Sequence, residues 1–404
     1  MRTITLLMLI LPSFMVLGQT SLPTLKSTTN RISIKEGTIF HKDSWTVSPK
    51  IKWDEFVTTP FKIKKTITFY SDIDSLSFTI KPNQIYDFII LLNDEQTAYT
   101  RINTSTDKPP SISIKKVLTY YKKLTSGKAT PDSIPFKIGA DNRIHILGKI
   151  NQSDSLDLIF DTGANAIVIN RSLINKRVNL NLNGQAQNQG SDGISIVATS
   201  SNNQLEIGNL IWDEVNILAI DYQDSPFDGV LGWIAFEEKM VEINYELNIL
   251  VIHPNIASIH PEYTQYPMKM IQGIPYIEGT VVTGNQKATG WFGFDTGCSS
   301  SILLSQRFAH EHRFKPILPP ISISTHLGSS GIAYQSNDYT LSKFKLGGFE
   351  TYLIPISINQ KDPEGVNNND ILGNLLLKRF NAILDFKNQV IYLKPNQLLH
   401  SSYY

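Results

Sequence analysis

Short stretches in which apolar and polar residues alternate recur along the chain, and this is the pattern of β-strands that bury one face. Residues 61–69 and 85–92 show this alternation, and turn formers stand beside them at 81–83 and 93–94. We therefore predict an all-β protein, in which the N-terminal part forms a small sandwich of sheets.

Breaks in the alternation divide the chain into segments. Linker-like residues at 104–110 and 125–131 flank residues 114–124, whose spacing predicts a short amphipathic helix. The segments that we expect are a signal peptide at 1–18, an N-terminal β-rich accessory domain with a β-sandwich-like fold at 19–103, a linker with the short helix at 104–131, and two halves at 132–256 and 257–404.

The beginning of the chain has the composition of a signal peptide. Arg2 precedes an apolar stretch at 4–17, and Val16 and Gly18 stand where small residues precede cleavage. Because this stretch is too short for a typical membrane span, we expect an exported protein, periplasmic or secreted, with no membrane anchor. The single cysteine, Cys298, allows no intrachain disulfide, and export without disulfides favours a bacterial protein.

Charge and histidine content argue against several classes of partner. The formal net charge is +1 and no long run of one sign occurs, so neither nucleic acid nor an anionic membrane surface is indicated. The eight histidines show no His-x-x-x-His motif with a carboxylate in place, and we expect His310 and His312, beside Glu311, to be solvated. We therefore expect no metal and no cofactor.

The larger, C-terminal part of the chain repeats itself once. Asp-Thr-Gly occurs twice, each time after an apolar run, and Gly-Ser-x-Gly-Ile follows 29 residues after the first aspartate and 33 after the second. Two matching halves predict one site with two-fold pseudosymmetry. The paired segments are 135–138 with 267–270, Gly148 with Gly279, 161–163 with 295–297, 190–194 with 328–332, 205–208 with 344–347, 230–232 with 371–373, and Asn244 with Asp385.

The two aspartates, Asp161 and Asp295, suggest acid–base chemistry. Two carboxyl groups held close together cannot both ionise cheaply, so the pair keeps one proton over a wide pH range. The ionised partner then deprotonates a water that attacks a carbonyl carbon, and the protonated partner donates to the carbonyl oxygen. A single Asp-Thr-Gly would be better explained as a turn, because Asp and Gly are common turn formers.

With these motifs, residues 130–396 resemble the retropepsin-like and pepsin-like aspartic peptidases, whose lobes each carry Asp-Thr-Gly, a glycine-rich flap and an apolar-apolar-Gly segment. The resemblance implies a two-lobed aspartic-protease β-barrel fold with pseudo-two-fold symmetry, and a monomer with a pseudo-dimeric active site. It implies that Thr162 and Thr296 tie each loop to the other lobe. Gly163 and Gly297 would permit the tight turn and the close backbone approach.

The Gly-Ser-x-Gly-Ile pair is a candidate for two flaps over the substrate. Glycine-rich tips between apolar runs are hairpin signals, and a flap can pair with an extended substrate by strand addition; surface hairpins without function are the alternative. Tyr334 is a candidate lid aromatic or an exposed strand residue. The candidate flap and substrate-binding residues are Gly190, Gly193, Ile194, Gly328, Gly331 and Ile332.

Ala164 and Cys298 follow the two Asp-Thr-Gly motifs, where acid-adapted family members often carry a hydroxyl. A hydroxyl that donates to a carboxylate lowers its pKa, whereas alanine donates nothing and a thiol donates weakly. We therefore expect an activity profile displaced toward weakly acidic or neutral pH. Cys298 has no obvious base beside it in the sequence, so we expect a small buried residue and not a nucleophile.

These inferences favour an exported aspartic endopeptidase that hydrolyses a peptide or protein substrate with a dyad-activated water. The alternative is a catalytically inactive peptide-binding module that retains the protease fold. A glycoside hydrolase is a third option, but the sequence singles out no sugar-stacking aromatics. The N-terminal domain is an accessory docking module, a spacer, or an inhibitory pro-region whose lysines neutralise the dyad; these lysines are Lys115, Lys116, Lys122 and Lys123.

Overall fold

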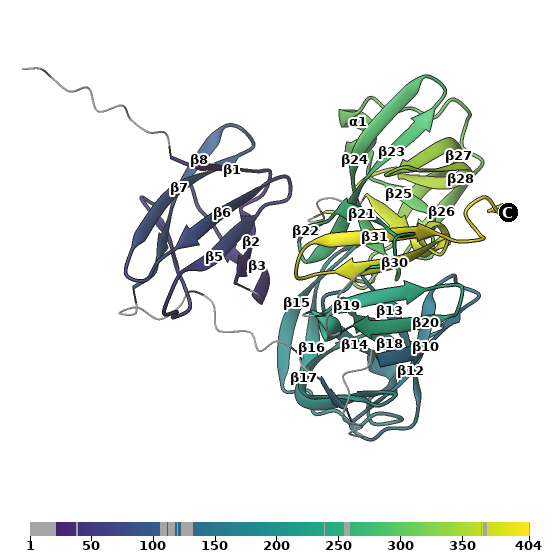
Figure 1. Cartoon of the computed structure of the whole chain (residues 1–404), viewed down its shortest axis with the longest axis horizontal. Coiled ribbons are helices and arrows are strands. Elements are labelled where there is room, and N and C mark those ends of the chain that lie inside the picture. The colour runs from purple at the N-terminus through teal and green to yellow at the C-terminus, as the bar shows by residue number, and fades with distance from the viewer. Residues whose placement is uncertain are drawn as a thin grey trace, which may run out of the picture.

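The computed structural model describes residues 22–37, 39–105, 111, 118, 120–122, 132–237, 239–253, 259–364, 366 and 370–403. The described chain is mostly β, with several sheets (Figure 1), so the all-β prediction is confirmed at this level. Within that part no helix is long and apolar enough to cross a membrane. The expected signal peptide lies outside the described residues. The helical elements are η1 Arg171–Leu173, η2 Trp233–Phe236, α1 Gln306–Glu311 and α2 Asn374–Leu377.

Residues 22–105 form an N-terminal module of two four-stranded sheets. Its strands are β1 Thr24–Ser27, β2 Arg31–Glu36, β3 Ile39–Thr46, β4 Asp54–Val57, β5 Lys65–Tyr70, β6 Ser75–Ile80, β7 Ile85–Leu92 and β8 Gln96–Asn103. Sheet I has the order β1-β7-β8-β4, and sheet II has the order β3-β2-β5-β6. Both contribute to one hydrophobic core, in which the Trp45 ring lies 5.5 Å from Phe69 of sheet II and 6.2 Å from Phe88 of sheet I.

Local predictions for this module are partly confirmed. The strand expected at 85–92 is β7, and the turn residues Asn83 and Asn93 have positive φ angles of 56° and 53°. The strand expected at 61–69 begins only at Lys65. Residues 61–64 alternate in sequence, but Ile63 is 78% exposed and this segment pairs with no strand in the described part.

The prediction of a helix at 114–124 is wrong for residues 120–122. Tyr120–Lys122 forms strand β9, which pairs antiparallel with Leu210–Ile220, strand β17. The Tyr120 ring lies 5.2 Å from Trp212 and 6.5 Å from Phe236, so tertiary packing has overridden the helical spacing. Most other residues of the linker, with Lys115, Lys116 and Lys123, lie outside the described part, as does the side chain of Lys122.

Two further sheets, III and IV, have the same strand order. Sheet III runs β11-β12-β13-β18-β14-β17-β16-β15, with β9 added at β17, and sheet IV runs β22-β23-β24-β29-β25-β28-β27-β26. In sheet III the remaining strands are β11 Lys137–Ile138, β12 Ile144–Ile150, β13 Leu156–Asp161, β14 Ile167–Asn170, β15 Gly184–Gly190, β16 Gly193–Ile207 and β18 Gly229–Gly232. In sheet IV the strands are β22 Lys269–Ile271, β23 Ile274–Thr283, β24 Gln286–Asp295, β25 Ile302–Leu304, β26 Ser322–His326, β27 Tyr334–Leu346, β28 Phe349–Asn359 and β29 Ile371–Gly373.

Each of these sheets closes on itself. An additional pairing of β12 with β16 joins the ends of a six-strand run in sheet III, and β23 with β27 does the same in sheet IV. Each closure makes a six-stranded barrel and leaves β15 and β26 as edge strands outside the ring. In Figure 1, sheet IV lies above and sheet III lies below.

Sheet V connects the two barrels. Its order is β10-β20-β19-β30-β31-β21, so three strands from the first half meet three from the second at the β19–β30 pair (Figure 1). Asn244 and Asp385 end matching strands and accept the backbone N–H of Leu247 and Asn388, respectively, at 3.0 and 2.9 Å. The strands are β10 Asp132–Pro135, β19 Met240–Asn244, β20 Ile249–His253, β21 Thr264–Pro267, β30 Phe380–Asp385 and β31 Val390–Pro395.

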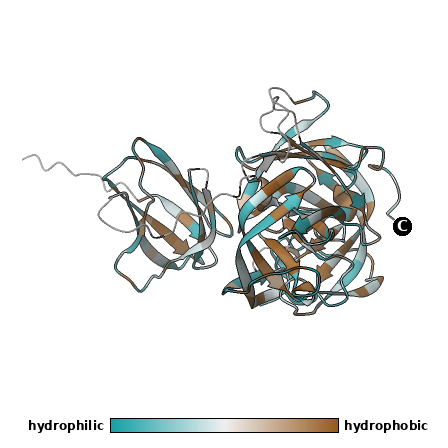
Figure 2. Ribbon diagram, turned by 90° about the horizontal axis from the view of Figure 1, so that it is seen from below, coloured by the Kyte–Doolittle hydropathy of each residue, from teal (hydrophilic) through white to brown (hydrophobic). Residues whose placement is uncertain are grey.

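Brown apolar and teal polar residues alternate along many strands of the barrels (Figure 2), as strands with one buried face require. The N-terminal module joins this body through specific contacts. Phe40 and Tyr70 are part of the body's core, Tyr70 receives a 2.6 Å hydrogen bond from Gln389, and Lys35 donates to the Lys387 carbonyl at 3.2 Å. The module is therefore seated against the body in this structure.

Candidate active site

The two Asp-Thr-Gly loops leave the ends of buried strands. Asp161 is the last residue of β13, which pairs parallel with β18, and Asp295 is the last residue of β24, which pairs parallel with β29. Phe160 and Phe294, which precede them, are 0% and 1% exposed. Burial of these phenylalanines fixes the strand ends, so each carboxylate emerges at a defined position.

The two loops are tied to each other by the threonines. Thr162 donates its hydroxyl to the carbonyl of Phe294 at 2.5 Å, and Thr296 donates its hydroxyl to the carbonyl of Phe160 at 2.7 Å. Each hydroxyl also accepts the backbone N–H of the other threonine, at 3.1 and 3.0 Å. Both threonines are fully buried, so this reciprocal set holds the loops together without competition from water.

The glycines allow the carboxylates to approach the opposite loop. A Cβ atom at Gly163 would lie 2.6 Å from the carboxyl carbon of Asp295, and one at Gly297 would lie 2.2 Å from that of Asp161. Real Cβ atoms do not come so close, so any side chain at these positions would push the carboxylates apart. The structure therefore brings Asp161, Asp295 and both glycines into one constellation.

Backbone donors distinguish the two aspartates. Asp295 Oδ1 accepts the N–H groups of Gly297 and Cys298 at 2.8 and 2.9 Å, whereas Asp161 Oδ1 accepts one backbone N–H within the described chain, that of Gly163 at 2.7 Å. Burial, the charge of Asp295 and a hydrogen bond with Asp295 raise the pKa of Asp161 well above its ordinary value. Burial also raises the pKa of Asp295, but its hydrogen bonds oppose that rise. The proton is thus better accommodated on Asp161.

A charged network supports the second loop from the first barrel. Arg143 donates from Nε to the Gly297 carbonyl at 2.6 Å and pairs with Asp141 at 3.2 Å. Asp141 contacts His145 at 2.9 Å, and His145 contacts Asp157 at 2.8 Å. Burial alone would lower the pKa of His145, but the two carboxylates outweigh burial and raise it. The Arg143 charge acts to lower the pKa of both Asp161 and Asp295.

The two Gly-Ser-x-Gly-Ile segments are the tips of hairpins, and the tips meet. Gly190 pairs with Gly193 at the end of the β15–β16 hairpin, and 328–332 lie between β26 and β27. A Cβ at Gly193 would lie 2.8 Å from Ile332 Cδ1, so the second tip packs directly on the first. Gly331 has a φ of 75°, a conformation that suits glycine, and Ile194 is 38% exposed.

A carboxylate, Asp192, joins the two tips. Its side chain is buried at 1% exposure and accepts the backbone N–H groups of Gly328, Ser330 and Ile332 at 3.0, 2.9 and 2.9 Å. The Ser330 hydroxyl donates back to the Gly193 carbonyl at 2.7 Å. We call this set of bonds the flap clasp, after the flap role predicted for these segments; it links the first hairpin tip to the second by main-chain and charged groups.

One comparison with known proteins decides the family of this region. Residues 146–234 match the model of the aspartyl protease family. The chain contains a retropepsin-like aspartyl protease domain. The matched range includes the loop at 161–163 and the first flap tip, while the loop at 295–297 lies beyond it. A search of curated proteins found no match to the chain.

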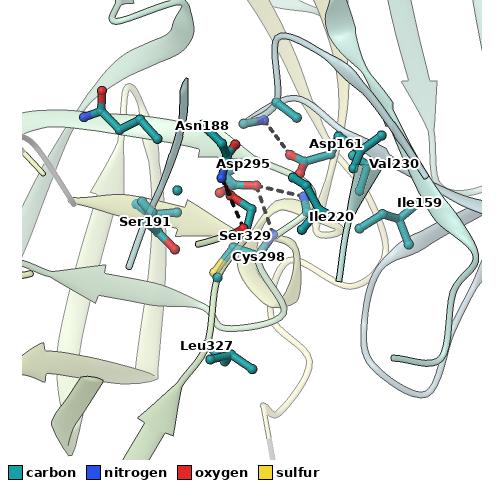
Figure 3. Close-up of a pocket in the computed structure, with 18 of the residues that line it drawn as sticks. Ile159, Asp161, Asn188, Ser191, Ile220, Val230, Asp295, Cys298, Leu327 and Ser329 are labelled. Carbon is teal, nitrogen blue, oxygen red and sulfur yellow. Dashed lines mark hydrogen bonds between the residues drawn. The ribbon is translucent and has the colours of Figure 1, made fainter. Parts of the chain in front are cut away.

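A cavity of about 730 Å³ lies between the Asp-Thr-Gly loops and the flaps of the aspartyl protease domain and sheet IV (Figure 3). On the side of the matched domain part of its wall is apolar, with Ile159, Ile220 and Val230 in one buried cluster. On the other side Gly293 stands where Ile159 does, two residues before the aspartate, and a Cβ there would lie 3.5 Å from the Tyr276 ring. The cavity is therefore lined by both apolar and polar residues, as is typical of a cleft that binds a peptide.

Other residues singled out from the sequence take less direct positions. Tyr334 lines the cavity and stacks on His326 with ring centroids 5.1 Å apart. Burial and the Asp295 charge raise the pKa of the Cys298 thiol to about 12, which keeps it protonated and unsuited to nucleophilic attack. His310 and His312 are exposed on and after α1. Among the described residues no cluster of three or more His, Cys, Asp or Glu could hold a metal ion.

Two candidate functional residues, Asp192 and Arg143, were not predicted from the sequence. Asp192 occupies the variable position of Gly-Ser-x-Gly-Ile, where the other half has Ser330, and this charged difference between matching motifs was the available signal. Arg143 lies in the turn between β11 and β12, and no feature of the sequence pairs it with Gly297. Contacts between residues 154 positions apart are set by the fold, so local patterns do not reveal them.

Proposed function

We propose that this protein is an exported aspartic endopeptidase, in which Asp161 and Asp295 form the catalytic dyad. The observation that carries the proposal is the pair of half-buried, mutually hydrogen-bonded carboxylates with raised pKa values, held on loops that the threonines tie together. The aspartyl protease domain implies a peptide substrate. Export rests on the signal-peptide composition of residues 1–18.

We further propose a two-lobed aspartic-protease fold that arose by internal duplication, preceded by a sandwich-like accessory module. The identical strand orders of sheets III and IV support this, as does sheet V, in which matching strands from the two halves flank a central pair. We keep 132–256 and 257–404 as the lobes and 19–103 as the module. The chain would then be a monomer with a pseudo-dimeric site.

In the proposed mechanism the two aspartates begin in different protonation states. Asp161 carries the proton and donates to Asp295, whose ionised form is stabilised by the N–H groups of Gly297 and Cys298. Asp295 takes a proton from a water held between the carboxyls, and that water attacks the scissile carbonyl carbon. Asp161 gives its proton to the carbonyl oxygen as negative charge develops there. As the tetrahedral intermediate collapses, Asp295 gives the proton it took to the nitrogen, Asp161 recovers a proton from a hydroxyl of the intermediate, and the C–N bond breaks.

Substrate would be held in an extended conformation below the flaps. The edge strands β15 and β26 end their sheets, so their outer backbone groups are available for pairing with an added strand. The apolar wall around Ile159 and Val230 would take an apolar side chain. The flap residues Gly190, Gly193, Gly328 and Gly331 permit the close approach of the tips over the cleft.

The decisive experiment incubates the mature protein with a mixed peptide library, with and without a statine-type inhibitor, and sequences the products. Wild-type protein should cleave internal peptide bonds, and Asp161→Asn and Asp295→Asn should each abolish cleavage while the melting temperature stays close to that of the wild type. The matched control is Asp213→Asn, at an exposed position on β17. Binding of peptides without any cleavage by the wild type would instead support an inactive peptide-binding module.

A further inference from the structure

The N-terminal module contributes a residue to the candidate active-site cavity. Arg31, the first residue of β2, lines the same cavity as Asp161 and Asp295. Its Nη2 donates to the side-chain oxygen of Gln187 at 3.3 Å, and turning that amide over brings the oxygen to 2.9 and 3.1 Å from the two Nη atoms. Gln187 lies on β15, the edge strand of the first flap. The module therefore places a cation beside the flap.

The position of Arg31 is fixed by the turn before it. The carboxylate of Asp72, which is 3% exposed, accepts hydrogen bonds from the Thr28 N–H at 2.8 Å and from the Ser27 hydroxyl at 3.0 Å. The Thr29 hydroxyl accepts the Arg31 N–H at 3.2 Å. Because this turn is anchored to the module's buried interior, the guanidinium is presented from a rigid support.

The Arg31 charge is not neutralised by a carboxylate within the described chain, where no acidic oxygen lies within ion-pair distance of it. The other arginine of the cavity, Arg143, is already engaged by Asp141 and the Gly297 carbonyl. A half-buried guanidinium whose described side-chain contact is an amide retains donors for a carboxylate, which it can bind in bidentate geometry.

The position of Gln187 on β15 locates this cation relative to the first flap tip. Gln187 precedes the tip residue Gly190 by three positions on β15, which corresponds to about 10 Å at a strand rise of about 3.3 Å per residue. A substrate strand that pairs with the free edge of β15 covers the same distance with about three residues. Arg31 thus lines the cavity about three substrate residues from the first flap tip, and in the proposed mode of binding the tips close over the scissile bond.

We propose that Arg31 forms an outer specificity subsite, which selects peptides with an acidic side chain about three residues from the scissile bond. This inference rests on the proposed peptidase function and names part of its substrate class. The N-terminal module is then an extension of the substrate-binding surface, and its docking contacts at Lys35, Phe40 and Tyr70 keep Arg31 in place.

The test uses pairs of a cleaved peptide that differ only by Glu or Gln at one position, moved from two to five residues from the scissile bond on either side. For wild type, kcat/KM should favour Glu about fivefold at one outer position, mostly through KM, as a partly exposed ion pair allows. Arg31→Gln should abolish that preference, Arg31→Lys should retain part of it, and Arg31→Glu should favour Lys at the same position. Lys50→Gln is the matched control, because it removes an exposed charge from the same module away from the cavity.

The outcomes separate this inference from the peptidase proposal. Equal cleavage of every Glu and Gln pair by the wild type, or a Glu preference that survives in Arg31→Gln, overturns the subsite while leaving the peptidase intact. If the wild type cleaves nothing, fluorescence anisotropy of the labelled pairs with the Asp161→Asn variant decides the matter. Fivefold tighter binding of the Glu peptide, lost with Arg31→Gln, then supports the subsite, and equal binding rejects it.

Discussion

The flap clasp offers a prediction that does not depend on catalysis. In the structure one buried carboxylate, that of Asp192, accepts three backbone N–H groups from the other flap tip, at 2.9 to 3.0 Å. We predict that Asp192→Asn separates the tips, because the amide nitrogen cannot accept a hydrogen bond and places a donor against at least one of the three N–H groups. Asp192→Ala removes all three acceptors and should have the larger effect.

The size of this effect follows from the bond count. A hydrogen bond to a charged group contributes about 1.5–3 kcal/mol, and three bonds that share one carboxylate do not add fully. We therefore expect the joined state of the tips to lose about 3 kcal/mol in Asp192→Asn, which corresponds to a factor of about 100 in its equilibrium constant. The backbone pairing within each hairpin, β15 with β16 and β26 with β27, does not involve the Asp192 side chain, so the hairpins themselves stay folded.

Amide hydrogen exchange measures the clasp directly. The N–H groups of Gly328, Ser330 and Ile332 should exchange about 100-fold faster in Asp192→Asn than in the wild type, while the N–H groups of sheet V keep their protection. Asp213→Asn, an exposed change on β17, should alter neither. Unchanged protection of the three N–H groups in Asp192→Asn would refute the reasoning, because it would mean that the carboxylate does not hold the tips together.

Three further predictions address the dyad and its support. Ala164→Ser with Cys298→Ser should shift the pH profile of kcat/KM downward, because hydroxyls that donate to the carboxylates stabilise their ionised forms; an upward shift would contradict this. Thr162→Val should lower the unfolding free energy by about 2–4 kcal/mol, since it removes the bond to Phe294 and leaves the buried N–H of Thr296 without its acceptor, whereas Thr162→Ser should remain close to the wild type in urea denaturation. Burial raises the pKa of Asp370 to about 6 from an ordinary value of 3.8, so the folded state binds its proton more tightly and stability falls as pH rises through that window. Relative to Asp370→Asn, the wild type should therefore lose about 2 kcal/mol of unfolding free energy between pH 4 and pH 7, and an equal pH dependence of the two would exclude this role.

Much of the fold could be predicted because strands leave a local trace. Strand β7 and the turns at Asn83 and Asn93 follow from alternation and turn formers within a few residues. The two Asp-Thr-Gly loops were visible as a repeated motif, and the structure brings them together through Thr162 and Thr296.

The features that could not be predicted from the sequence depend on contacts between residues that are distant along the chain. Strand β9 forms because Tyr120 packs on Trp212, which overrides a helical spacing that looked sufficient alone. Arg143 and Arg31 owe their positions to contacts with residues 154 and 156 positions away. No period or motif encodes such a contact, so these charges were unremarkable until the tertiary arrangement was known.

Sheet V has a consequence for how the protein can be divided. Its central β19–β30 pair joins the two halves, and each half by itself would expose that strand's hydrogen-bonding edge to solvent. If the two halves were produced separately, each would carry an unpaired strand edge that is complementary to the edge of the other. Pairing of β19 with β30 would then bring Asp161 and Asp295 together again. The two halves could therefore serve as a split reporter, in which peptide hydrolysis is measured only when the two fragments have associated.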